Sequence, residues 1–113
     1  MYRSIGINRT GVTSICQIRP YGPEAIRGVE WICFGSTTFS AMLPVYTNVS
    51  RMPRYLSDVT LDTSTENFYW GSRLIDALAD HNYNTCIQTI DTLNKVLLDA
   101  STHMKNGYNL ADN

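Results

Sequence analysis

The 113-residue sequence is short of charge and of long apolar runs. Charged residues make up 17% of it, and a net charge of −1 gives no reason to expect nucleic acid or an anionic membrane as a partner. No apolar run approaches the roughly 20 residues that cross a bilayer. The first five residues also lack the basic-then-apolar layout of a signal peptide. We therefore expect a cytoplasmic protein with no membrane segment.

Cysteine is scarce as well. Cys16, Cys33 and Cys86 are odd in number and widely spaced, which argues against a disulfide framework and against a zinc site. A glycine-rich phosphate loop and a G-x-S-x-G nucleophile motif are both missing from the sequence. We expect neither a metal nor a cofactor, and a reducing compartment.

The residues that are present suit one domain over residues 1–113, since 43% are hydrophobic and a chain of this length can bury a core. Charge is distributed unevenly along it. Residues 1–60 hold six arginines, no lysine and three acidic residues, a net charge of +3, whereas residues 61–113 carry −4. We expect the positive half to face the functional site and the negative half to face water.

Secondary structure divides at about the same place, with strands and loops over residues 1–62, helices over 63–107 and a tail over 108–113. Apolar and β-branched residues predict strands at 12–18 and 29–34, which form a hairpin. Both faces of that hairpin carry apolar side chains, so we expect a sheet that is covered on both sides. Residues 36–62 are irregular, with a short helical turn after Ser36 and two prolines that exclude a long element.

The second half predicts two helices. Thr63 to Glu66 fits a capping box at the start of the first helix. Asp80 to Asn82 separates the two, and apolar residues at helical spacing then predict a long helix that ends at Asn106–Gly107. The fold class is therefore α+β, with a β-hairpin, an irregular middle and a helical pair.

Few residues predict chemistry directly. His81 and His103 are typical of surface or capping positions, and Cys16 and Cys33 of small hydrophobes within strands. Asp76 and Asp80 lie four residues apart on one helix face, and we expect both to be solvated. Two arginines, Arg9 and Arg19, flank the first strand, where they could bind a carboxylate or serve as surface and interface residues.

An ordered series of short segments resembles N-terminal-nucleophile dipeptidases and, more distantly, secernins. The segments are residues 3–10, 18–20, 23–24, 28–31, 34–36, 43–46, 67–70 and 73–74, followed by the helix to Asn106. The resemblance implies an αββα sandwich of two stacked sheets between helical layers, and metal-free cleavage of dipeptides. It also implies a cysteine nucleophile at the mature N-terminus, whose own α-amine takes the thiol proton.

This chain departs from that family pattern because it begins with Met1–Tyr2. We expect it to be the C-terminal segment of such an enzyme, with no catalytic residue of its own and the nucleophile upstream. The segment alone is then inactive towards dipeptides, and its exposed sheet edge favours homo-oligomers. The candidate substrate-binding residues are Asn8, Arg9 and Thr10, which precede the first strand. The alternative is a free-standing α+β binding or interaction domain without catalysis.

Overall fold

A three-stranded sheet and two long helices make up the computed structural model, which describes residues 2–7 and 9–111, with side chains through residue 103. The α+β prediction is confirmed. The strands are β1 (Val12–Ile18), β2 (Gly28–Phe34) and β3 (Leu43–Tyr46), and the helical segments are η1 (Glu24–Ile26), α1 (Arg54–Ser57), α2 (Phe68–Asp80) and α3 (Tyr83–Ala111).

The sheet is antiparallel, in the order β1-β2-β3, so β2 is its central strand. The predicted hairpin of β1 and β2 is confirmed, with Val12 opposite Phe34 and Ile18 opposite Gly28. The short 3-10 helix η1 lies in the loop between them and buries Ile26. On this central strand the inward side chains Val29 and Cys33 are only 1% and 0% exposed.

The middle of the chain is more regular than the sequence predicts. A single turn follows Ser36 as expected, since the amides of Phe39 and Ser40 both donate to its carbonyl oxygen. The third strand was not predicted, because Pro44 lies within it, opposite Trp31. Proline has no amide hydrogen to donate, and β3 accommodates it because it is an edge strand with one unpaired side.

Helix α2 begins four residues later than the expected capping box allows. Asn67 is the N-cap, and its side-chain Oδ1 accepts a 2.9 Å hydrogen bond from the amide of Trp70. The hydroxyl of Ser64 instead accepts from the amide of Glu66. The capping-box prediction was therefore wrong, because the serine hydroxyl closes a local turn in front of the helix.

Helix α3 differs from its prediction at the C-terminal end. It continues through Asn106–Gly107 to Ala111, so the predicted stop was wrong, and four residues assigned to the tail are helical. A glycine inside a helix costs about 1 kcal/mol relative to alanine, which weakens a helix without ending it. None of the helices among the described residues is long and apolar enough to span a membrane.

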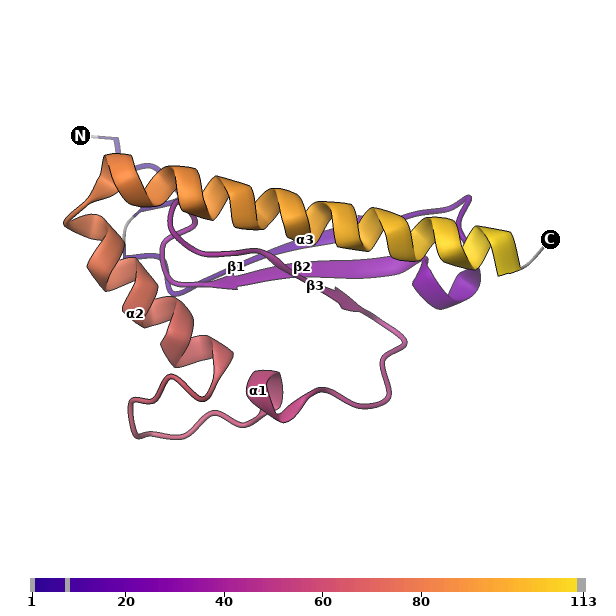
Figure 1. The fold of residues 1–113 in the computed structure, drawn as a ribbon, viewed down its shortest axis with the longest axis horizontal. Helices are drawn as coiled ribbons and strands as arrows, with labels where there is room; N and C mark the ends of the chain where they lie inside the picture. Colours follow the sequence, from indigo (N-terminus) through magenta and orange to yellow (C-terminus); the bar gives the residue numbers. More distant parts are fainter. Residues whose placement is uncertain (1, 8, 112–113) are drawn as a thin grey trace.

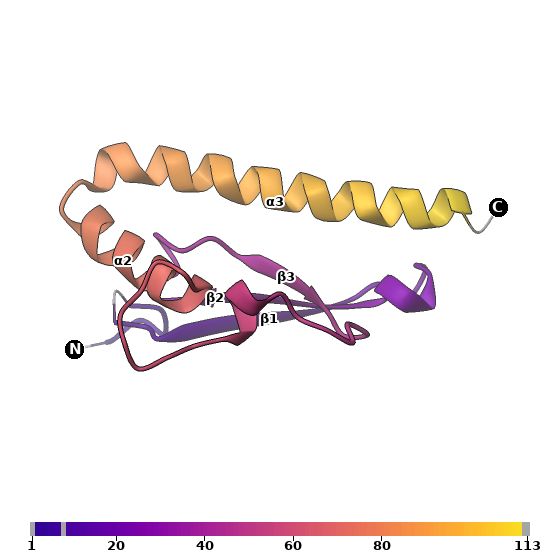
Figure 2. The ribbon, with the colours of Figure 1, turned by 60° about the horizontal axis from the view of Figure 1, so that its bottom comes forward.

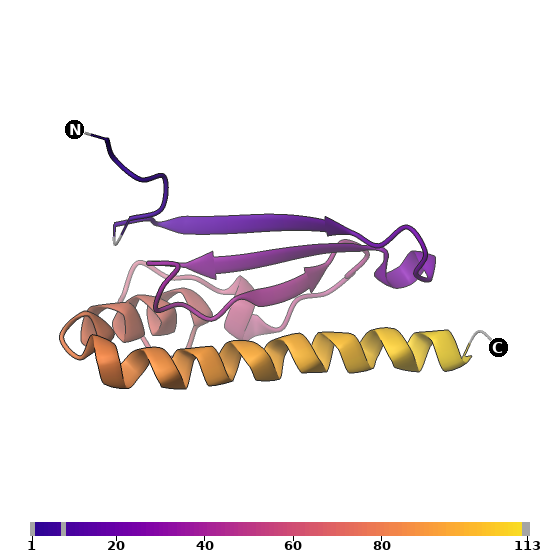
Figure 3. The ribbon, with the colours of Figure 1, turned by 90° about the horizontal axis from the view of Figure 1, so that it is seen from above.

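The helices are arranged around the sheet as Figures 1 and 3 show. Helix α3 runs along the length of the molecule on the β3 side, so that β1, β2, β3 and α3 follow one another in Figure 3. Helix α2 packs at the end of β2, where Phe34 makes edge-to-face contacts with Phe68 and Tyr69. The connection from β3 to α2, which contains α1, leaves the sheet on the side away from α3 (Figure 2).

Two bonds tie the far end of α3 to the sheet. Arg19 donates from Nη2 to the hydroxyl of Ser101 at 3.2 Å, and the hydroxyl of Tyr46 lies 3.2 Å from the same atom. The Arg19 guanidinium also donates to Gln17, whose side-chain oxygen accepts from Trp31 as well. Arg19 therefore has a structural role in joining β1 to α3.

The buried core is small for a chain of this length. The accessible surface is 8505 Å², against about 6300 Å² for a typical folded monomer of this mass. The radius of gyration is 15.9 Å, whereas about 13 Å is typical of 113 residues. A second apolar cluster joins Phe39, Ala79 and Ile90, but much of the remaining apolar surface stays exposed.

Strand β1 shows this exposure most clearly. Ile15 and Ile18 lie on opposite faces of the sheet and are 52% and 77% exposed. The expectation of a sheet covered on both sides was therefore wrong for β1. Its outer edge is also unpaired, because β2 is its one neighbour in the described sheet.

We predict that the chain self-associates through this edge, because unpaired backbone groups and exposed apolar side chains favour strand pairing between copies. Sedimentation at high concentration should show dimers or larger species. Ile15→Lys should shift the protein towards monomer, since a charge on an edge strand opposes pairing. Leu98→Lys, on α3 and 54% exposed, serves as the control and should leave the association unchanged. A wild-type chain that remains monomeric at every concentration would contradict the prediction.

Candidate functional site

Two of the predicted substrate-binding residues, Arg9 and Thr10, lie just before β1, next to the end of β2. Arg9 is exposed and Thr10 is half-buried, whereas Asn8 lies outside the described residues. Thr10 closes a turn with Ile7: its amide donates to the Ile7 carbonyl at 2.9 Å, and its hydroxyl accepts from the Ile7 amide at 3.0 Å. The turn directs the Arg9 side chain to solvent at the rim of the sheet.

A second loop lies beside this turn. The amide of Gly35 donates to the carbonyl of Gly11, and the next amide, that of Ser36, donates to Oδ2 of Asp76 at 3.1 Å. Ser36 and Ser40 are 3% and 1% exposed. The loop after β2 is thus held between the start of β1 and helix α2.

Asp76 differs from its prediction, which was that its carboxylate is solvated. It is half-buried and bonded to the Ser36 amide, whereas Asp80 is exposed as expected. The two bonded residues are forty positions apart, and no local pattern could have paired them. The carboxylate accepts a backbone hydrogen bond, so its role here is to position the loop.

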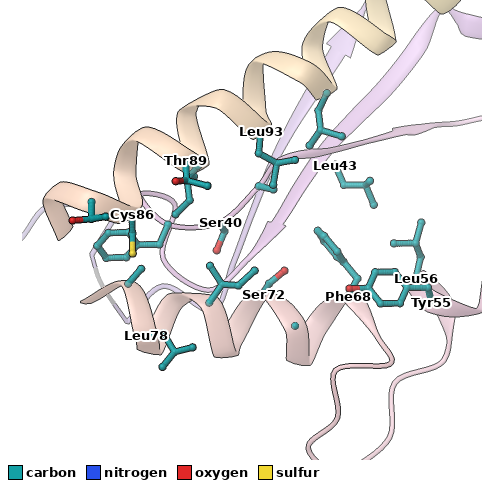
Figure 4. Close-up of a pocket in the computed structure, with 18 of the residues that line it drawn as sticks. Ser40, Leu43, Tyr55, Leu56, Phe68, Ser72, Leu78, Cys86, Thr89 and Leu93 are labelled. Carbon is teal, nitrogen blue, oxygen red and sulfur yellow. The ribbon is translucent and has the colours of Figure 1, made fainter. Parts of the chain in front are cut away.

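A larger apolar groove lies between α2, α3, β3 and the connection that contains α1. Its volume is about 740 Å³. The close-up in Figure 4 shows side chains of α2 and α3 converging on it from two sides. The polar groups among its described lining residues are the side chains of Ser40, Tyr55, Ser72, Thr85, Cys86 and Thr89.

Those lining residues limit what the groove can bind. None of the described ones carries a carboxylate, an ammonium, a guanidinium or an imidazole. A zwitterionic peptide would lose the hydration of two charges on entering, with no opposite charge to compensate. The groove is therefore suited to an apolar occupant.

The cysteines are all free, and they differ in environment. Cys16 is exposed on β1, Cys86 is half-buried against the Phe39 cluster, and Cys33 is fully buried in β2. Burial raises the pKa of the Cys33 thiol above its usual value, and hydrogen bonding to Thr13 offsets this in part. A nucleophile needs the opposite shift, so Cys33 is a core residue, as expected.

The histidines and acidic residues form no metal centre in the described part of the chain, where no three metal-ligating side chains cluster. His81 is exposed at the C-cap of α2, and His103 is exposed on α3. Both positions agree with the surface and capping roles expected of them.

The fold and the site together define an α+β segment with an incompletely covered sheet and an apolar groove. Comparison with known proteins identifies the family. The model of peptidase family C69 matches residues 1–96, and the chain belongs to this family.

Individual relatives support the family assignment. The chain is 42% identical over 91 residues to a dipeptidase of Bifidobacterium longum, a match that covers 80% of this chain and 17% of that protein. It is 48% identical over 84 residues to a probable dipeptidase A of Streptococcus pyogenes, covering 74% and 18%. A dipeptidase A of Lactobacillus helveticus is 43% identical over 82 residues, covering 73% and 17%. The chain thus spans less than a fifth of the length of these relatives.

The loop between β2 and β3 depends on a glycine, and Gly35→Ala should test this dependence. Gly35 has φ +88°, and an added Cβ would lie 3.0 Å from Oδ2 of Asp76. Strain of this kind costs about 1–3 kcal/mol, so we expect the free energy of unfolding to fall by that amount. The control is Gly11→Ala, where a Cβ meets no atom within 4 Å. Equal denaturation midpoints for the two variants would contradict the account.

The reactivity of the three thiols should follow their burial. At pH 8 we expect an alkylating reagent to modify Cys16 first and Cys33 last, because burial both shields the Cys33 thiol and raises its pKa. Raising the pH should narrow the difference between the alkylation rates of Cys16 and Cys33, since the thiolate fraction of Cys33 then increases. Peptide mapping by mass spectrometry measures the three rates, and early modification of Cys33 would show that its thiol is accessible to the reagent and contradict its burial in β2.

Proposed function

We propose that this chain is the C-terminal segment of a dipeptidase. The observation that carries the proposal is its identity of 42–48% to proteins described as dipeptidases, over about three quarters or more of the chain. The accessible surface of 8505 Å² supports it, because a segment removed from a larger fold leaves apolar surface without its natural cover.

In this proposal the nucleophile is a cysteine at the mature N-terminus of the parent enzyme, upstream of residue 1. Its free α-amine, with a reference pKa of about 7.7–8.0, removes the thiol proton without a separate histidine. Attack on the peptide carbonyl gives an oxyanion, which hydrogen-bond donors stabilise, and then a thioester that water hydrolyses. The reaction requires no metal or cofactor, and the three free thiols suit a reducing cytoplasm.

The present chain contributes Asn8, Arg9 and Thr10 to the substrate cleft of the parent. The Thr10 turn fixes this segment at the end of the sheet, and the exposed guanidinium of Arg9 suits the C-terminal carboxylate of a dipeptide. The apolar groove is a poor alternative for the substrate, because a dipeptide carries two charges.

The isolated chain should hydrolyse no dipeptide. A chimera that carries this chain in place of the matching segment of the Bifidobacterium longum dipeptidase should be active. Product release from a panel of unmodified dipeptides measures both. Turnover by the isolated chain, abolished by thiol alkylation, would contradict the proposal. A well-folded but inactive chimera would favour the alternative of a non-catalytic interaction domain.

Arg9 can be tested within that chimera. We expect Arg9→Ala to lower kcat/KM by about tenfold or more, mainly through KM, because a hydrogen bond to a charged group contributes about 1.5–3 kcal/mol. Arg9→Lys should recover part of the loss, since it keeps the charge without the planar fork. Arg3→Ala removes an exposed arginine from the same N-terminal segment and should have no effect. Equal kcat/KM values for Arg9→Ala and Arg3→Ala would show that Arg9 does not bind the substrate.

A further inference from the structure

The groove between α2 and α3 has a shape and composition that call for a covering segment. Its members come from four parts of the chain, and several are only partly buried: Ile75 is 48% exposed, Leu93 43% and Tyr55 47%. Half-exposed aliphatic and aromatic side chains around a 740 Å³ hollow are typical of a docking surface. In Figure 4, Leu93 and Cys86 of α3 both extend towards α2 across this space.

We propose that an apolar segment from the part of the parent enzyme outside this chain occupies the groove. The inference rests on the proposed function, because it takes the chain to be part of a longer dipeptidase. The inference adds the site at which this chain contacts the rest of that enzyme.

The amount of uncovered surface favours this occupant over a second copy. The accessible surface exceeds the typical value for this mass by about 2200 Å², whereas each partner of a standard protein–protein interface buries about 800 Å². The relatives supply enough polypeptide to cover it, since the matched segment is 17–18% of their length. Contacts that bury this much surface are typical of the interior of one larger fold and exceed what a second copy would cover.

The chemistry of the groove also restricts its occupant. Its described lining residues bear no formal charge, so an apolar helix or strand would lose no ionic hydration on docking. Hydroxyl groups of Ser72 and Thr89 lie among the lining residues and can bond to backbone groups of the incoming segment. The charged residues Asp91 and Lys95 of α3 are not among those that line the groove.

The test compares thiol accessibility in the isolated chain and in the chimera with the Bifidobacterium longum dipeptidase. Leu93→Cys places a probe in the groove, Cys86 is a native probe there, and Leu98→Cys is the matched control on the same helix. In the chimera, alkylation at position 93 and at Cys86 should slow by about tenfold or more, as for a site that reacts only on local opening. The rate at position 98 should change far less.

Each other result has a defined meaning. An active chimera in which position 93 reacts as fast as in the isolated chain overturns the groove proposal and leaves the proposed function intact. A folded, inactive chimera in which position 93 is protected supports the groove proposal and contradicts the proposed function. Equal slowing at positions 93 and 98 overturns the assignment to the groove. Protection of position 93 that grows with the concentration of the isolated chain assigns the groove to a second copy and also overturns the proposal.

A second measurement uses the isolated chain alone and does not depend on the folding of the chimera. An apolar fluorescent dye should bind the dilute chain, and Leu93→Gln should lower the fluorescence enhancement measurably more than Leu98→Gln does. Circular dichroism checks that both variants keep their helices. Equal dye binding by the two variants would mean that the groove does not bind the dye and would overturn the proposal.

Discussion

The two-sided pairing of β2 is the interaction on which the rest of the structure depends. Its hydrogen bonds to β1 and β3 fix it as the central strand, and its side chains Val29 and Cys33 lose nearly all contact with water. The aromatic ring of Phe34, at the end of the strand, packs against the first turn of α2. The loop after β2 is held by Asp76 of α2, so the sheet, this loop and α2 form one continuous unit.

Outside that unit the molecule is held by few contacts. Helix α3 is fastened near one end by the Phe39 cluster, near its middle by Asn94, whose Oδ1 accepts from the Met42 amide, and further along by Ser101. Strand β1 is bonded along one edge and exposed on both faces. Surface of this kind costs free energy in water, and the share of it that lies on β1 and in the groove fits a segment that completes a larger sandwich.

Part of this architecture could be predicted from local sequence because the physical causes are local. β-Branched and aromatic residues bounded by Gly28 and Gly35 predict β2, and apolar spacing predicts α2 and α3. Other features could not be predicted. Strand β3 was missed because Pro44 argues against a strand unless the strand lies at an edge, and edge position is a property of the whole sheet. The start of α2 was misplaced because Thr63 and Asn67 are both good caps, and the packing of Phe68 on Phe34 selects the second.

The candidate site divides in the same way. The sequence by itself determined the α+β class, the hairpin, the helical pair, the absence of a paired-cysteine framework and the resemblance to dipeptidases, because each depends on residue type and order. Only the tertiary structure decided that Asp76 positions the loop after β2, that Arg19 joins β1 to α3, and that a charge-free groove separates the two helices. The first two features depend on contacts between residues forty or more positions apart, and the groove depends on the packing of four separate parts of the chain. No local pattern encodes such contacts.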